Sequence, residues 1–109
     1  MKNWHDFLLT TDATIRDAIA VLEKNQCSVI VDSEEHIVGT VTDRDIRKAL
    51  LDQIPMDDSI CGVMNKSPST LAYPLDSSEI RLKLSKFTFE QFPVVDSQKK
   101  IMGLSRSKT

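Results

Sequence analysis

The chain has 109 residues, of which 40% are hydrophobic and 28% charged, so it can bury one core but is too short for two independent domains. A formal net charge of −2 and a pI near 5.6 exclude a broad nucleic-acid interface, which needs a clustered basic face. A small anionic ligand stays compatible with this composition. No apolar run is long enough to cross a bilayer and the N-terminus lacks a signal core, which predicts a soluble, cytoplasmic protein without a membrane partner.

The first half of the chain predicts the element order β-α-β-β-α. Apolar residues recur at helical spacing between Asp12 and Lys24, and Thr14-x-x-Asp17 forms a capping box at the start of that helix. The remaining elements are three strands and a second helix, at Phe7–Leu9, Ser28–Val31, Ile37–Val41 and Asp43–Leu51. We expect Ile46, Ala49 and Leu50 on the buried side of the second helix.

A linker follows, and the pattern then starts again. Pro55 and the polar residues after it interrupt the second helix, and Ile60–Met64 suggests a short connecting helix. The second half predicts strands and a helix at Ser69–Leu71, Ser77–Lys86, Phe92–Val95 and Ile101–Leu104. The chain is therefore divided into repeat 1 (residues 1–55), the linker (56–66) and repeat 2 (67–109).

The two repeats share a hairpin signature. Cys27–Gly39 reappears as Gln91–Gly103, sixty-four residues later, in unbroken register. We therefore expect one structural unit used twice around a shared core. Repeat 2 lacks the apolar residues for a closing helix after Leu104, so either the chain is a fragment of something longer or a partner covers the bare face.

The segment Gly39–Asp45 is the first candidate site, because it lies where a strand ends and a helix begins. The first N–H groups of a helix have no internal partners and suit an anion. Thr42 offers a hydroxyl for phosphate or ribose, and Asp45 offers acceptors for the ribose hydroxyls. Thr42-x-x-Asp45 is equally a capping box that stabilises the helix by about 1 kcal/mol without a ligand. Both interpretations remain open at this point.

The order and duplication of these segments resemble tandem cystathionine-β-synthase (CBS) domains, the Bateman module. The resembling residues are Thr14–Ala18, Val29–Asp32 and Ile37–Ile46 in repeat 1, and Val63–Asn65, Ser69–Thr70, Phe92–Asp96 and Ile101–Leu104 in repeat 2. The resemblance implies an α+β fold of two pseudo-symmetric repeats packed sheet to sheet, with clefts that often hold adenosine nucleotides. It implies ligand-binding roles for Thr42 and Asp45 and for Thr40 in the same segment, with backbone and small side chains around Ala13 and Ser28 lining the base pocket.

Repeat 2 departs from the pattern at its end. Aligning Gly103 with Gly39 places Arg106 at the position of Thr42 and Thr109 at that of Asp45, so the carboxylate is missing. We therefore expect at most one intact nucleotide site per chain.

Together with these observations, the resemblance implies a regulatory module that is not an enzyme, needs no cofactor or metal, and forms a homodimer. Its ligand would be AMP, ADP, ATP or a similar adenosine compound. The N-terminal residues are also similar to those of CBS pairs that precede bacterial sugar-phosphate nucleotidyltransferase domains, which implies a fused or associated catalytic domain. The alternative is a ligand-free dimerisation or interaction scaffold.

Overall fold

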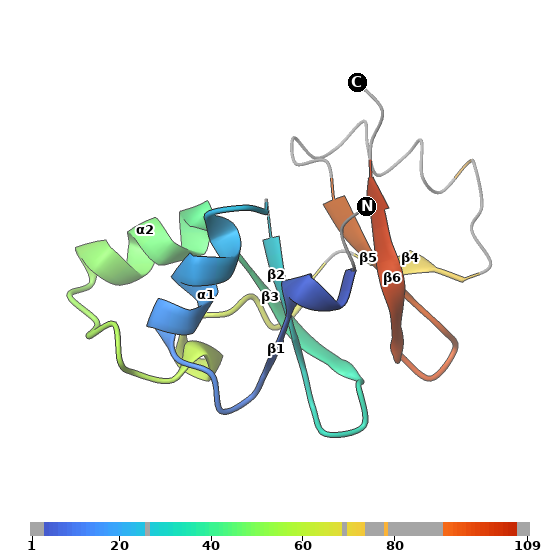
Figure 1. Cartoon of the computed structure of the whole chain (residues 1–109), viewed down its shortest axis with the longest axis horizontal. Coiled ribbons are helices and arrows are strands. Elements are labelled where there is room, and N and C mark those ends of the chain that lie inside the picture. The colour runs from blue at the N-terminus through green and yellow to red at the C-terminus, as the bar shows by residue number, and fades with distance from the viewer. Residues whose placement is uncertain (1–3, 26, 69, 74–77, 79–90, 107–109) are drawn as a thin grey trace.

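The computed structural model describes residues 4–25, 27–68, 70–73, 78 and 91–106. It is a mixed α+β fold with two sheets of three strands each. Two helices cover the outer face of the first sheet, and the second sheet lies on the opposite side of it (Figure 1). None of the described helices is long and apolar enough to span a membrane.

The first sheet has the strand order β1-β2-β3. It is formed by β1 (Leu8–Thr10), β2 (Cys27–Val31) and β3 (Ile37–Thr42), and a short 3-10 helix, η1 (Trp4–Phe7), precedes β1. Strand β1 is parallel to β2, whereas β2 and β3 form an antiparallel hairpin. Every residue of β2 is buried, as expected of a continuous apolar run at the centre of a sheet that is covered on both faces.

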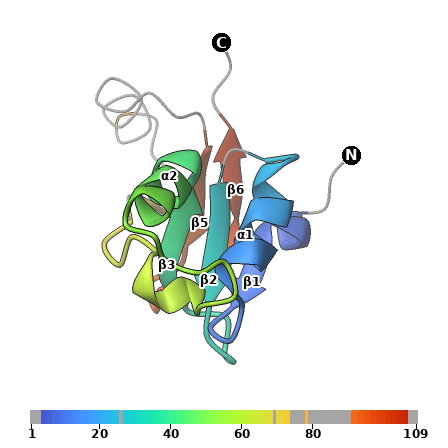
Figure 2. The same cartoon turned by 90° about the vertical axis from the view of Figure 1, so that its left-hand side faces the viewer.

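The helices α1 (Ile15–Leu22) and α2 (Asp43–Leu51) lie side by side on this sheet (Figure 2). The predicted capping box of α1 is confirmed: the Asp17 N–H donates to Thr14 Oγ1 at 3.2 Å, and the Thr14 N–H donates to Asp17 Oδ2 at 2.9 Å. Helix α2 buries Ile46 and Ala49. The expected burial of Leu50 is wrong, because this side chain is 55% exposed and the core contact of α2 is limited to the other two residues.

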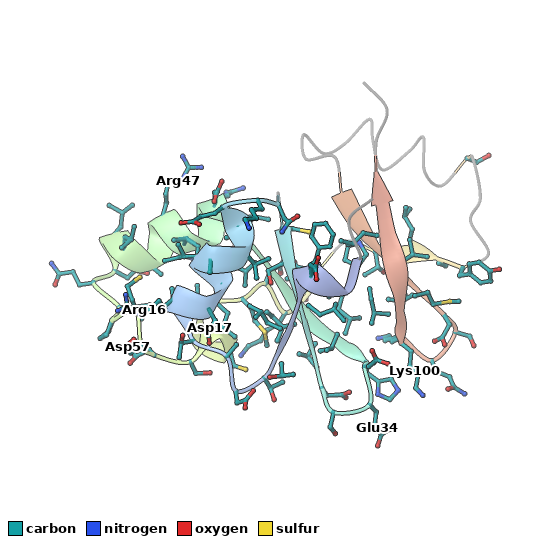
Figure 3. The ribbon with its side chains drawn as sticks, in the orientation of Figure 1. Arg16, Asp17, Glu34, Arg47, Asp57 and Lys100 are labelled. Atoms are coloured by element: carbon teal, nitrogen blue, oxygen red, sulfur yellow. The ribbon has the colours of Figure 1, made fainter. Side chains whose placement is uncertain are left out.

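The linker is part of the fold rather than a free connection. Its short helix, η2, is a 3-10 turn over Ile60–Gly62, and Ile60 is fully buried against the two helices. The Ile60 N–H donates to the Ala13 carbonyl at 2.9 Å. Arg16 and Asp57 form an exposed ion pair at 3.0 Å between α1 and the linker (Figure 3). The linker therefore ties repeat 1 together before the chain enters repeat 2.

The second sheet repeats the register of the first. Its strands β4 (Leu71–Ala72), β5 (Gln91–Val95) and β6 (Ile101–Arg106) have the order β4-β5-β6 with the same parallel and antiparallel pairings. Even the irregularity between Ile30 and Val31 recurs between Val94 and Val95. The duplicated unit is thus confirmed for the hairpins, while the predicted helix at Ser77–Lys86 lies outside the described residues except for Ser78.

The two hairpins meet at their turns through a reciprocal pair of backbone hydrogen bonds. The Ile37 N–H donates to the Lys99 carbonyl at 3.0 Å, and the Ile101 N–H donates to the Glu35 carbonyl at 2.9 Å. Ile37 and Ile101 are equivalent in the two repeats, as are Glu35 and Lys99, so a pseudo-twofold axis passes between the turns. Figure 3 shows Glu34 and Lys100 on these neighbouring turns. Beside this contact the sheets share a core that includes Val29, Val31 and Ile101, as the repeat predicts.

Each turn is organised by an aspartate that accepts backbone hydrogen bonds. Asp32 Oδ1 accepts from the N–H groups of Glu34 and His36, both at 2.9 Å. Asp96 Oδ1 accepts in the same way from Gln98 at 2.8 Å and Lys100 at 3.0 Å. The pKa of Asp32 is lowered mainly by the backbone hydrogen bond from His36. The pKa of Asp96 is lowered mainly by the equivalent hydrogen bond from Lys100.

We expect these two turns to contribute to acid sensitivity. A carboxyl with a lowered pKa in the folded state stabilises the fold above its ordinary pKa of about 3.9 and loses that contribution as the pH falls through the lower folded value. The Asp32→Asn/Asp96→Asn variant should therefore lose less stability than the parent between pH 5 and pH 3, as measured by urea unfolding. Asp58→Asn, at an exposed residue outside the two turns, controls for the loss of one such charge. An unchanged pH profile in the double variant would contradict the assignment.

Candidate functional site

Thr42 and Asp45 lie together at the junction of β3 and α2, as the sequence predicts. Thr42 is the last residue of β3 and the residue that caps α2. Its N–H donates to Asp45 Oδ2 at 2.9 Å, and its hydroxyl donates to the same oxygen at 3.2 Å. Both residues are half-buried. The interpretation of Asp45 as a capping residue is therefore confirmed.

The capping role leaves part of this site free for a ligand. Among the described residues, Asp45 Oδ1 has no hydrogen-bond partner, whereas Oδ2 accepts two hydrogen bonds. The first N–H groups of α2 lie at the same point and present the positive end of the helix dipole. Asp45 can thus accept a hydroxyl group through Oδ1 while Oδ2 keeps the helix start intact.

Thr40 is held by the linker instead of facing an open cleft. Its N–H donates to the Asn65 carbonyl at 3.1 Å, and its carbonyl accepts from the Asn65 N–H at 2.8 Å. The residue is only 9% exposed. Gly39 next to it allows a close approach, and the groups that approach are Met64 and the Asn65 carbonyl.

The structure separates Ala13 from the other predicted site residues. Ser28 is paired with Val41, next to the Thr42 end of the sheet. Ala13 follows β1, whose last residue Thr10 lies opposite Val31 at the other end of β2. Because β1 and β3 run in opposite directions, residues that follow β1 and residues that follow β3 lie at opposite ends of the sheet.

Ser28 and Ala13 are both engaged within the protein. Ser28 has no exposed surface, and its hydroxyl donates to the Phe7 carbonyl at 3.1 Å. Ala13 is 7% exposed and belongs to the core under the helices. Their predicted roles in a base pocket stay predictions, and any such role would have to involve a rearrangement or the backbone of neighbouring residues.

In repeat 2, Arg106 takes the place of Thr42. It lies opposite Gln91 in the β5–β6 pair, as Thr42 lies opposite Cys27 in the β2–β3 pair. The alignment that removes the carboxylate from repeat 2 is therefore supported by the register, while Thr109 lies outside the described residues.

The cysteines are free thiols, and Cys27 is buried next to the candidate site. Burial raises the pKa of its thiol to about 11, so the group is protonated at neutral pH and is a poor nucleophile. Cys61 is half-buried, and its Sγ donates to the Thr11 carbonyl at 3.3 Å. Cys27 thus acts as a small core residue.

Sequence reasoning missed a groove between the linker and the second hairpin. It has a volume of about 450 Å³, and its lining includes Lys66 and Lys99. The linker residues had been interpreted only as a connection. A position-by-position comparison of the two repeats would have indicated the difference, because Lys99 replaces Glu35 at the same place in the turn.

Comparison with known families finds that the model of the CBS domain matches residues 5–52. The inosine-5′-monophosphate dehydrogenase of Nitrosopumilus maritimus is 32% identical over 104 residues, which are 94% of this chain and 21% of that enzyme. The chain spans between 21% and 28% of the length of the curated relatives it matches. None of these relatives is described as a nucleotidyltransferase, so the predicted resemblance to that group is not supported.

Solved structures show the same fold over nearly the whole chain. A putative acetoin utilization protein from Vibrio cholerae has a TM-score of 0.79 at 22% identity, covering 91% of this chain and 75% of that chain. The CBS domain pair of protein MJ0100, solved in complex with 5′-methylthioadenosine and S-adenosyl-L-methionine, has a TM-score of 0.75 at 26% identity and covers 91% of this chain and 82% of that chain. The predicted α+β architecture is thus confirmed.

Proposed function

We propose that the chain, whose residues 5–52 match the model of the CBS domain, is a regulatory CBS pair that binds an adenosine-containing ligand at Thr42 and Asp45 and passes the occupancy of this site to a fused or associated domain. The observation that carries the proposal is the half-buried Asp45 carboxylate, which keeps one oxygen free at the start of α2. A CBS pair of the same fold, at 26% identity, was solved with two adenosine-containing ligands, which supports this ligand class.

The chemistry of the site suits a ribose followed by a phosphate or another polar group. Asp45 Oδ1 accepts a ribose hydroxyl, and the charged acceptor makes this hydrogen bond stronger than one between neutral groups. The N–H groups at the start of α2 suit a phosphate, and Arg44 offsets the nearby carboxylates. Because repeat 2 has Arg106 and no carboxylate at the corresponding place, we propose one such site per chain.

Titration calorimetry with AMP, ADP, ATP and S-adenosylmethionine tests the proposal. We expect at least one of them to bind, and Asp45→Ala to weaken binding by about tenfold or more, since a hydrogen bond to a charged group contributes about 1.5–3 kcal/mol. Asp17→Ala is a matched control, because it removes the equivalent capping residue from α1. Absence of binding at millimolar ligand, or equal losses in both variants, would refute the site.

A ligand-free scaffold that associates with a second copy is the alternative function. The exposed apolar side chains at the end of α2 favour it, since Leu51 is 84% and Leu50 is 55% exposed. Light scattering of the parent chain and of Leu50→Ser/Leu51→Ser separates the two functions. A parent dimer that dissociates in the variant and binds none of the four adenosine compounds supports the scaffold, whereas a monomer that binds one of them refutes it.

The regulated domain is itself a proposal. CBS domains are regulatory modules, and the relatives that this chain matches include an enzyme more than four times its length, as the 21% coverage shows. We therefore propose that the chain acts on a catalytic domain and performs no reaction itself. Turnover of a substrate by this chain alone would contradict that assignment.

A further inference from the structure

The groove between the linker and the second hairpin lies at the opposite end of β3 from Thr42. Its walls include Ile37 and Val38, the first residues of β3, and Val95 next to the second turn. Thr42 lies five positions after Ile37, which corresponds to about 17 Å along an extended strand. A volume of about 450 Å³ lies within the range of small-molecule sites. The groove is therefore separate from the proposed adenosine site.

The groove combines an apolar wall with two cationic side chains. Lys66 comes from the linker and Lys99 from the second turn, and both are exposed. Neither forms an ion pair among the described residues. Hydroxyl groups of Ser67, Thr70 and Ser97 are further hydrogen-bonding groups in the lining.

Asp96 is the carboxylate in this lining, and one of its oxygens is already engaged by the second turn. Its Oδ1 accepts the N–H groups of Gln98 and Lys100. Lys100 and His36 also lower its pKa through their charges. The lining therefore carries two ammonium groups against one carboxylate, which leaves a net positive charge to attract an anion from solvent.

The pseudo-symmetric position in repeat 1 is built differently. The same turn position carries Glu35 instead of Lys99. The residue equivalent to Lys66 is Trp4, because the segments around β1 and β4 align with an offset of sixty-two positions. In repeat 1, the 3-10 helix η1, which contains Trp4, contacts β6 at the equivalent place. The fold does not require two lysines at this place, since the equivalent unit does without them.

We propose that the groove is a second ligand site, for a small organic phosphate. The phosphate group binds Lys66 and Lys99, and the apolar part of the ligand packs against Ile37 and Val95. A ligand there contacts the linker, the first residues of β3 and the second turn at once. It therefore stabilises the contact between the repeats independently of Asp45.

Amide chemical shifts of the 109-residue chain, followed during titration with phenyl phosphate at low ionic strength, test the proposal. We expect the largest shifts at Val38, Ser67 and Lys99, with inorganic phosphate binding more weakly because it lacks an apolar part. Lys66→Gln/Lys99→Gln should weaken binding by about tenfold or more. Arg47→Gln/Lys48→Gln removes the same charge from α2, where Figure 3 shows Arg47 pointing away from the sheets, and should leave binding unchanged.

If the groove variant and the α2 variant weaken phenyl phosphate binding equally, the effect comes from the overall charge of the protein, and the proposal is overturned. Shifts confined to Thr42–Asp45 would likewise overturn it, because they place the phosphate at the other site. The Asp45→Ala variant should bind phenyl phosphate like the parent. This result also separates the two sites. If no nucleotide binds, the groove proposal is unaffected, and if phenyl phosphate does not bind in the groove, the proposed adenosine site is unaffected.

Discussion

Replacing Gly39 by alanine should destabilise the protein by about 1–3 kcal/mol, the usual cost of overpacking a filled core. A Cβ at this position would lie 2.6 Å from Met64 Sδ, 2.8 Å from Met64 Cγ and 2.9 Å from the Asn65 carbonyl oxygen. The methionine side chain can move, whereas the carbonyl is held because the adjacent Asn65 N–H is bonded to Thr40. We therefore expect the linker to separate from β3, which urea unfolding and the exchange of the Thr40 and Asn65 amides will measure.

The equivalent glycine of repeat 2 is a matched control. Gly103 lies opposite Val94 as Gly39 lies opposite Ile30, but a Cβ there meets no atom of the described residues within 4 Å. Gly103→Ala should therefore change the free energy of unfolding by no more than about 0.5 kcal/mol. In the Gly39→Ala background, Met64→Ala should recover only part of the loss, because the contact with the Asn65 carbonyl remains. Equal effects of the two glycine substitutions would show that the close linker contact does not matter.

The duplicated hairpin could be predicted from sequence because it depends on local chemistry. An apolar run, an aspartate and a four-residue turn recur at fixed spacing, and the turns of Asp32 and Asp96 have the same hydrogen bonds. The same holds for the capping residues Thr14 and Asp17, which lie three positions apart in one turn of helix. Features specified within a few residues were thus predicted correctly.

The remaining features depend on contacts between distant segments. The bridge between Thr40 and Asn65 and the groove of Lys66 and Lys99 arise only when the linker lies beside β3. No local pattern indicates that alignment. The family resemblance assigns Ala13 and Thr42 to one site, whereas the opposite directions of β1 and β3 place the two residues at different ends of the sheet, so their joint role stays a prediction. Prediction of a site from sequence therefore needs the strand directions as well as the motif.

Truncation of Ile101 to alanine should destabilise the whole chain by about 2–4 kcal/mol, as for other buried isoleucines. Ile101 is 7% exposed and packs in the core between the sheets with Val29 and Val31, although it belongs to repeat 2. Its N–H also bonds to the Glu35 carbonyl of repeat 1. Because the lost contacts are made with repeat 1, amide hydrogen exchange should become faster in β2 as well as in β6. Where exchange occurs through global unfolding, the rates in the two strands should rise by the same factor.

The neighbouring residue provides the control for that experiment. Met102 is 43% exposed and lies next to Ile101 on β6, where successive side chains point to opposite faces of the sheet. Met102→Ala should cost no more than about 0.5 kcal/mol and leave exchange in β2 unchanged. If Ile101→Ala accelerates exchange only in β6, the repeats unfold separately and their shared core does not couple them. If exchange in both strands rises together, a ligand that stabilises either repeat stabilises the pair, which is the physical requirement for a module that reports occupancy to another domain.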